Sequence, residues 1–276
     1  MSLVLPLVTH SHSLLSLTPH HPPFRYNDAH TQHANDPLIT ELSDAASQIK
    51  AKAALSAKQY MGVAVADTPW TRHTPSSASP SSSNALTTDQ IMQRASSAFS
   101  SSSDALTTDQ IMQLHPDGTG KPRSRLEIYT TAFQIQDAYQ DHVKATYCGP
   151  GGTHKRAPIK KWERVYQKTE RAYGSRVERC KDIVRSTLVF PDVASVLACL
   201  RRIEEDEAMT ILNIKNRMDP AHSDASGYRD VALLLVGRDV TDNLIVELQL
   251  NTQSMFDAKS GGGHKRYVEA RDSMGD

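Results

Sequence analysis

The period at which apolar residues recur between residues 183 and 250 constrains the fold of this sequence more than any other feature. Four segments are apolar or alternate with a period of two, as strands do, and they are 183–190, 210–215, 231–236 and 244–250. One helix-like stripe lies between the first two, formed by Val193, Val196, Leu197, Leu200 and Ile203. A single helical crossover among strands joined by short turns predicts a mixed sheet covered by helices.

Three more helices are expected around these strands. Residues 123–147 repeat near 3.6, with an inward stripe of Leu126, Tyr129, Phe133, Tyr139, Val143 and Tyr147. Residues 158–173, capped by Gly174, turn inward Trp162, Val165, Tyr166 and Thr169. A last helix over residues 252–272 is interrupted by three glycines. The predicted fold class is α/β (α+β), a mixed β-sheet of about four to five strands flanked by helices.

Residues 1–120 differ in composition from the rest of the chain, and we expect them to be largely disordered. Serine makes up 12 of the 29 residues in 76–104, and such a segment cannot bury enough apolar surface to offset the entropy of ordering it. Residues 38–60 favour a helix, either isolated or docked. A folded α/β domain is therefore expected over residues 121–276.

The serine-rich region contains a tandem repeat with a period of 20 residues. Residues 81–93 recur at 101–113, with Asp104 in place of Asn84. The Thr-Thr-Asp-Gln-Ile-Met-Gln part of each copy could start a short capped helix. Two copies are too few for a solenoid, so the repeat is either a neutral duplication or a short motif that binds a partner twice.

The distribution of charge narrows the choice of partner, although the formal net charge is zero. Residues 155–181 carry ten Lys and Arg against three Glu. Such a segment is either a surface that faces phosphate groups or the solvated face of a helix. RNA is one partner that such a basic surface would bind, with an affinity that falls steeply as salt rises.

Cysteine usage and hydropathy indicate a cytoplasmic protein. Cys148, Cys180 and Cys199 are too widely spaced for a Cys-x-x-Cys metal site, so we interpret them as reduced thiols. No segment approaches the roughly 20 apolar residues that cross a membrane. Residues 1–17 resemble a weak targeting peptide but lack a basic first part, so organelle targeting has little support.

Polar residues occupy the ends and one face of the predicted strands. Asp182 opens the first strand, Lys215 closes the second, and Tyr228 precedes the third. Glu247, Gln249 and Asn251 share one face of the fourth, because side chains on a strand alternate. A row of a carboxylate and two amides can line a polar cleft, although an exposed sheet face explains it about as well.

Together these residue types match the parts of a nucleotide site. One or two carboxylates with phosphate oxygens hold magnesium, and Asp182 and Glu247 are the candidates. Basic side chains bind polyphosphate, and the candidates on the second helix are Lys160, Lys161, Arg164 and Lys168. Tyr228 could stack on a base. Phosphoryl and pyrophosphoryl transfer depend mainly on such positioning and charge stabilisation.

The order and spacing of these motifs resemble one known family. Residues from about 155 to 270 resemble the synthetase domain of the RelA/SpoT alarmone (guanosine tetraphosphate) synthetases, which have a nucleotidyltransferase-like fold. The matching segments are Lys160-Lys161 with its helix, Lys181-Asp182-Ile183-Val184, Gly227-Tyr228-Arg229, Val246-Glu247-Leu248-Gln249-Leu250-Asn251-Thr252 and His264-Lys265-Arg266-Tyr267. The family transfers pyrophosphate from ATP to the 3′-hydroxyl of GDP or GTP with magnesium, so the resemblance implies those substrates and that metal.

The resemblance also implies a role for each candidate residue. Asp182 and Glu247 would hold the metal, and Glu247 would help to activate the acceptor hydroxyl. Tyr228 would stack on the guanine. The remaining substrate-binding candidates would grip phosphates or line the cleft, and they are Lys160, Lys161, Arg164, Lys215, Arg229, Gln249, His264 and Lys265.

Three positions depart from the family pattern and keep a second hypothesis open. The family's Tyr-x-Ser-x-His is Tyr228-Arg229-Asp230-Val231-Ala232 here, Thr187 stands where the family has Arg, and so does Asn251. Asp230 in a phosphate cleft would repel substrate or recruit another metal. The alternative to an enzyme is therefore a catalytically degenerate nucleotide-binding or protein- or RNA-interaction module on the same fold.

Overall fold

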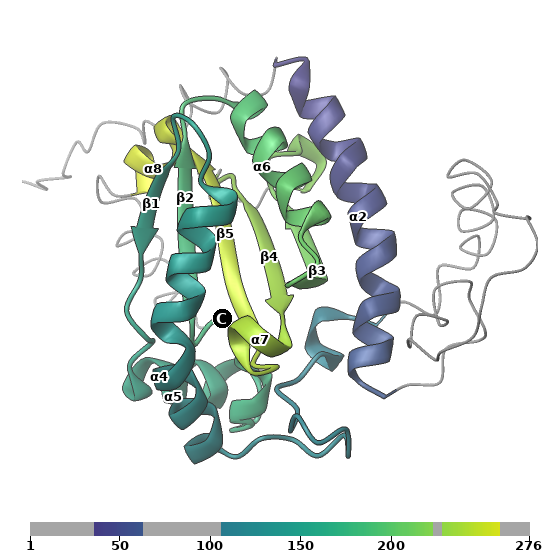
Figure 1. Cartoon of the computed structure of the whole chain (residues 1–276), viewed down its shortest axis with the longest axis vertical. Helices are drawn as coiled ribbons and strands as arrows, with labels where there is room; N and C mark the ends of the chain where they lie inside the picture. Colours follow the sequence, from purple (N-terminus) through teal and green to yellow (C-terminus); the bar gives the residue numbers. More distant parts are fainter. Residues whose placement is uncertain (1–35, 63–105, 223–227, 260–276) are drawn as a thin grey trace, which may run out of the picture.

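The computed structural model describes residues 36–62, 106–222 and 228–259 (Figure 1). Its α-helices are α2 (Leu38–Tyr60), α4 (Arg125–His142), α5 (Trp162–Ala172), α6 (Val193–Glu205), α7 (Arg238–Thr241) and α8 (Gln253–Ala258). Its strands are β1 (Thr153–Arg156), β2 (Arg185–Phe190), β3 (Thr210–Asn216), β4 (Val231–Val236) and β5 (Val246–Thr252).

The five strands form one mixed sheet in the order β1-β2-β5-β4-β3, which confirms the predicted fold class. Among the described strands, β2 and β5 pair in parallel and the other three pairs are antiparallel. Helix α6 makes the crossover that leaves β2, as the sequence predicted. Strand β1 was not predicted, because Thr153-His154-Lys155-Arg156 contains no apolar residue and lies at the sheet edge.

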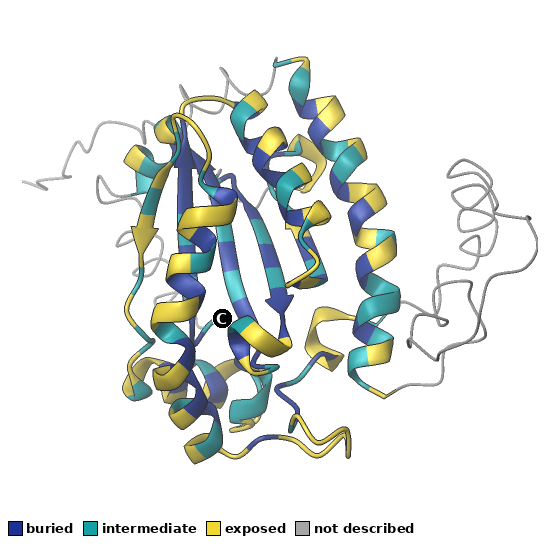
Figure 2. Ribbon diagram, in the orientation of Figure 1, coloured by how far each residue is buried: buried dark blue, intermediate teal, exposed yellow. Residues whose placement is uncertain are grey.

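The two faces of the sheet differ in polarity because side chains alternate along each strand. On β5, Val246, Leu248 and Leu250 are fully buried, in the same core as apolar residues of α4 and α6. Glu247 and Gln249 point to the opposite face and are half-buried. The alternation expected for this strand is therefore confirmed, and the polar face of β5 is the place to look for a site (Figure 2).

Helix α2 belongs to the same packed body as the sheet. It contacts edge strand β3 and α6, and its buried side chains recur at helical spacing, namely Ile39, Leu42, Ala46, Ile49, Ala53 and Ala57. The helix expected at residues 38–60 is thus present and docked. The packed body includes it and residues 106–120, ahead of residue 121, where the sequence suggested that the domain begins.

Two of the helices bury part of the predicted inward stripe, including Tyr139 of α4 and Val165 and Thr169 of α5, but expose other members of it. In α4, Leu126 and Phe133 are 75% and 70% exposed, and Tyr166 of α5 is 51% exposed, so their inward placement is wrong. The buried stripe of α4 runs instead through Ile128, Ala132, Ile135 and Tyr139. Its spacing of three or four residues places Leu126 and Phe133 on the solvent side.

A π-helical turn, Val143–Tyr147, continues α4 as far as the predicted end at residue 147. It brings the Tyr147 hydroxyl to the Asp206 carboxylate, which also lies 2.7 Å from His142 Nε2. Burial alone would raise the pKa of Asp206, but the hydrogen bonds from Tyr147 and its other donors outweigh burial and lower that pKa. This network joins the end of α4 to the end of α6.

The C-terminal part of the predicted last helix lies outside the described residues, which reach residue 259 and include α8. In the described part of the chain, no helix combines the length and the apolar character that crossing a bilayer requires. Cys148, Cys180 and Cys199 all lie within it as unpaired thiols.

Candidate functional site

Asp182 and Glu247 meet where the parallel strands β2 and β5 begin. Asp182 comes three residues before β2, and the first residue of that strand is in register with Glu247. The backbone N–H of Glu247 donates to the carbonyl of Val184 at 3.0 Å, which fixes the two chain segments together. Burial raises the pKa of the Glu247 carboxyl, and the negative charge of Asp182 raises it further.

Two lysines balance the charge of Asp182. Its Oδ2 atom lies 2.5 Å from Lys160 Nζ and 3.1 Å from Lys168 Nζ. Burial would raise the pKa of Asp182, but the two ammonium groups hold it well below its usual value. Burial would likewise lower the pKa of Lys168, and the Asp182 carboxylate outweighs that effect and raises it. Asp182 and Lys168 therefore stabilise each other's charged form.

The position of Lys160 is fixed by its own backbone. Its N–H donates to the Ile183 carbonyl at 2.9 Å, and its carbonyl accepts from the Tyr129 hydroxyl at 2.8 Å. These bonds join the segment before α5 to the segment before β2 and to α4. The Lys160 ammonium is therefore held at Asp182 by the fold and not by its side chain alone.

A second polar cluster lies farther along the same face of β5. The Tyr228 hydroxyl donates to Asn251 Oδ1 at 2.8 Å, and Lys259 Nζ donates to the Tyr228 oxygen at 3.1 Å and to Gln249 Oε1 at 3.2 Å. Lys259 Nζ and the Arg217 guanidinium carbon lie 4.8 and 5.7 Å from the Tyr228 ring centre. Since two cations contact this ring, stacking on a guanine base would require one of them to move.

Asp230 is neutralised inside the fold and does not face an open cleft. It is fully buried, and its Oδ1 atom lies 2.5 Å from Arg217 Nη2. The backbone N–H of Arg217 also donates to the backbone carbonyl of Asp230 at 2.8 Å. Burial raises the pKa of Asp230 in spite of the nearby cations. The acidic residue at the family's Ser position is thus accommodated by a partner on the neighbouring strand end.

The other predicted substrate-binding residues lie in different surroundings. Arg229 is buried, and its Nη1 donates to the Met218 carbonyl at 2.8 Å. Lys161, Arg164 and Lys215 are exposed, the first two at the start of α5 and the third on β3. His264 and Lys265 lie outside the described residues.

Two cations of the site, Arg217 and Lys259, were not among the predicted site residues. Lys168, which contacts Asp182, belongs to the basic helix that the sequence predicted to bind phosphate. Arg217 directly follows β3 and Lys259 lies at the C-terminal end of α8, and no sequence pattern links either residue to Tyr228.

The acidic residues of the site limit which metal it could hold. No group of three or more His, Cys, Asp or Glu able to hold a metal occurs among the described residues. Asp182 and Glu247 alone still fit magnesium, because this ion commonly takes one or two carboxylates and completes its shell with water and substrate phosphate oxygens. The repulsion between them, seen in the raised pKa of Glu247, is the repulsion that a divalent cation would relieve.

Comparison with known proteins gave matches among solved structures alone. No family model and no curated protein matches the chain. The small alarmone synthetase 1 of Bacillus subtilis is 14% identical, with 53% of this chain and 78% of that chain covered at a TM-score of 0.41. The same enzyme bound to its product pppGpp is 15% identical (52% and 76%, TM-score 0.37). A GTP pyrophosphokinase family protein of Streptococcus pneumoniae is 17% identical (52% and 73%, TM-score 0.36).

These matches come from the family that the sequence motifs resemble. Their identities and TM-scores are too low to carry an argument about activity.

Proposed function

We propose that this protein is a divergent RelA/SpoT-like pyrophosphokinase that transfers pyrophosphate from ATP to the 3′-hydroxyl of GDP or GTP with magnesium. The observation that carries the proposal is the pairing of Asp182 and Glu247 beside Lys160 and Lys168 on one polar face. Two carboxylates beside two ammonium groups suit a polyphosphate and its metal. Free thiols in the chain agree with a reducing compartment, and we place the reaction in the cytoplasm.

In this proposal Asp182 and Glu247 hold magnesium, and the metal, when bound, neutralises charge on the transferred pyrophosphate. Lys160 and Lys168 bind phosphate oxygens of ATP, and the exposed Lys161 and Arg164 attract the nucleotide by their charge. The raised pKa of Glu247 suits it to take a proton from the acceptor hydroxyl, because a general base works best when its pKa approaches the working pH.

The acceptor nucleotide would lie toward the Tyr228 end of β5. Gln249 lies between Glu247 and Asn251 on that strand, and it is half-buried on the polar face. Lys259 binds both Gln249 and Tyr228, so we propose that it swings from the tyrosine to a phosphate of the acceptor. That movement would free the Tyr228 ring for stacking on the guanine base.

The proposal is tested by incubating the protein with ATP, magnesium and either GDP or GTP, and separating the nucleotides by anion-exchange chromatography. We expect a product with two added phosphates, and a loss of at least about 100-fold in rate for Glu247→Gln. Glu163→Gln, on the exposed first turn of α5, is the matched control and should keep full activity. Equal rates for wild type and Glu247→Gln would contradict the proposed enzyme.

The structure also offers support for the catalytically degenerate alternative. The Tyr228 ring is already contacted by two cations, and Asp230 is present in place of the family's Ser. If turnover is absent, titration calorimetry with ATP and GTP in the presence of magnesium separates the remaining cases. Micromolar binding that Asp182→Asn weakens would indicate a nucleotide-binding module, whereas the absence of binding would leave an interaction module.

A further inference from the structure

Residues 106–113, the described part of the second copy of the tandem repeat, are docked on the domain. Ile111 is fully buried in a small cluster with Ala57, Leu212, Val236 and Ile245, which come from α2, β3, β4 and the segment before β5. The short helix η2 (Thr108–Gln110) precedes Ile111, and a capping box between Thr107 and Gln110 starts it. The short capped helix predicted for this motif is therefore confirmed in the second copy.

Polar contacts fix the register of the docked copy. Gln113 is fully buried; its Nε2 donates to the Ile245 carbonyl at 2.9 Å, and its Oε1 accepts from the Ile245 N–H at 2.8 Å. Lys181 Nζ donates to the carbonyls of Thr108 at 2.7 Å and Ile111 at 3.1 Å. Asn213 Nδ2 donates to Thr108 Oγ1 at 3.2 Å. The surface around Ile245 and Lys181 thus forms hydrogen bonds with both the side chains and the backbone of this motif.

The first copy supplies the same groups. Residues 86–93 have the same sequence as residues 106–113, Leu-Thr-Thr-Asp-Gln-Ile-Met-Gln. Ile91 and Gln93 correspond to the two buried anchors, and Thr88 corresponds to the residue bonded by Asn213 and Lys181. The two copies begin to differ at the next position, where Arg94 corresponds to Leu114.

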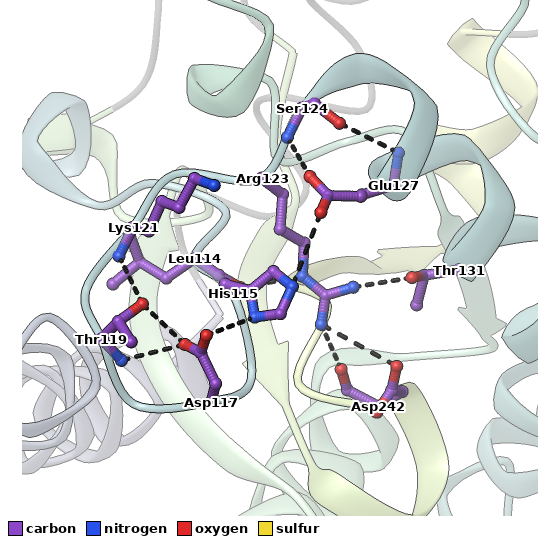
Figure 3. A network of polar contacts seen from close by, with 10 residues as sticks. All are labelled: Leu114, His115, Asp117, Thr119, Lys121, Arg123, Ser124, Glu127, Thr131 and Asp242. Carbon is purple, nitrogen blue, oxygen red and sulfur yellow. Dashed lines mark hydrogen bonds and ion pairs between the residues drawn. The ribbon is translucent and has the colours of Figure 1, made fainter.

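We propose that the surface which holds residues 106–113 also accepts residues 86–93 of the same chain, so that the two copies exchange at one docking site. The contacts described above would be kept, because they end at Gln113 and its counterpart Gln93. Leu114 would stay in place, since its N–H donates to the Tyr60 hydroxyl at 3.1 Å and its carbonyl accepts from Arg123 at 2.8 Å. Figure 3 shows Leu114 and Arg123 in this network. The inference is independent of the proposed function.

The chain lengths allow this exchange. With the second copy docked, 43 residues join Gly62 to Leu106; with the first copy docked, 23 residues join Gly62 to Leu86 and 20 join Gln93 to Leu114. Even the shorter connections exceed what neighbouring ends need, because one extended residue spans about 3.3 Å. Closing two loops in place of one favours docking of the second copy by roughly 30- to 100-fold. The second copy therefore occupies the docking site in most molecules, and the first copy occupies it when the second cannot bind.

The Ile245 N–H reports on the docking site, because Gln113 accepts its hydrogen bond. Amide hydrogen exchange and urea unfolding would be measured on the full chain for Ile111→Asp, for Ile91→Asp and for the double variant. A carboxylate at either anchor position cannot be buried in the apolar cluster without a partner. Deletion of residues 94–113, which joins Gln93 directly to Leu114, serves as a positive control for docking of the first copy.

We expect Ile91→Asp and the deletion to behave as wild type. In Ile111→Asp the Ile245 amide should stay protected, with a protection factor lowered by roughly 30- to 100-fold, and the double variant should lose this protection or fail to fold. Loss of protection, or loss of folding, in Ile111→Asp to the same extent as in the double variant would overturn the proposal. Protection in Ile111→Asp that rises with protein concentration would also overturn it, because the occupant would then come from another molecule.

Discussion

Replacement of Arg123 by methionine should destabilise the protein strongly, although Arg123 lies far from the candidate site. Its side chain is 3% exposed, and Figure 3 shows its three bonds. Nε donates to the Leu114 carbonyl at 2.8 Å, Nη1 to Thr131 Oγ1 at 2.6 Å and Nη2 to the Asp242 carbonyl at 2.5 Å. One guanidinium therefore joins the loop after the docked repeat, helix α4 and the turn before β5.

The size of the effect follows from the acceptors that lose a donor. Each buried acceptor left without one costs about 1–3 kcal/mol, but the Thr131 hydroxyl can rotate and methionine removes the cost of burying a charge. We expect a net loss of about 3 kcal/mol in the free energy of unfolding. Asp242 adds to the need for this contact, because its backbone is held at a φ of 47°, which a non-glycine residue rarely adopts.

Urea unfolding followed by circular dichroism would measure this loss as a lowered midpoint at an unchanged slope. Lys121→Met is the matched control, because Lys121 is an exposed residue of the same loop, and it should change the free energy by less than about 0.5 kcal/mol. Arg123→Lys keeps the charge without the forked geometry and should recover only part of the loss. A loss below about 1 kcal/mol for Arg123→Met would refute this reasoning.

Three further predictions concern the charged groups of the site and the core. Lys168→Met should lower pyrophosphate transfer by at least about 10-fold, while Lys161→Met should lower it less, and rates at saturating ATP would show the difference. Glu247→Gln should raise the free energy of unfolding by about 0.5–2 kcal/mol at pH 7, because it removes a buried charge that Asp182 repels. This gain should vanish below about pH 4, where the carboxyl is protonated in both the folded and the unfolded protein. Thermal unfolding at the two pH values would measure it, and a gain of the same size at both would contradict this reasoning. Asp206→Asn should lower the free energy of unfolding at pH 7, because the lowered pKa of Asp206 means that its charged form stabilises the folded protein. The difference from wild type should shrink as the pH falls below about 3.9, the ordinary pKa of an aspartate. A difference that stays constant from pH 7 to pH 3 would contradict this prediction.

Much of the sheet could be predicted because its central strand alternates so clearly. From Val246 to Asn251 the side chains that face the core are all apolar and those that alternate with them are polar, so the period alone predicted the strand and its buried side. Strand β1 offered no such signal, since pairing with β2 at the sheet edge and not burial makes it a strand. The helix α4 was found, but Leu126 and Phe133 were misplaced because two overlapping stripes satisfy the same period.

The candidate site was only partly predictable, because the sequence supplied more cations than the site uses. The basic segment offers Lys160, Lys161, Arg164 and Lys168, and only the packing of α5 against the start of β2 selects Lys160 and Lys168 for Asp182. Arg229 illustrates the reverse case. Arg229 lies in the Gly227-Tyr228-Arg229 motif that resembles the family, yet its guanidinium is buried and donates to the Met218 carbonyl.

The parallel pairing of β2 with β5 also has a consequence for how the protein folds. Strands β3, β4 and β5 follow one another along the chain, whereas Arg185 pairs with Glu247, about 60 residues later. Contacts between residues so distant in sequence form slowly, because the intervening chain must first be ordered. The two carboxylates would therefore come together late in folding, and a folding intermediate that has its β3-β4-β5 meander but not this pair would already have a native-like core without the candidate site.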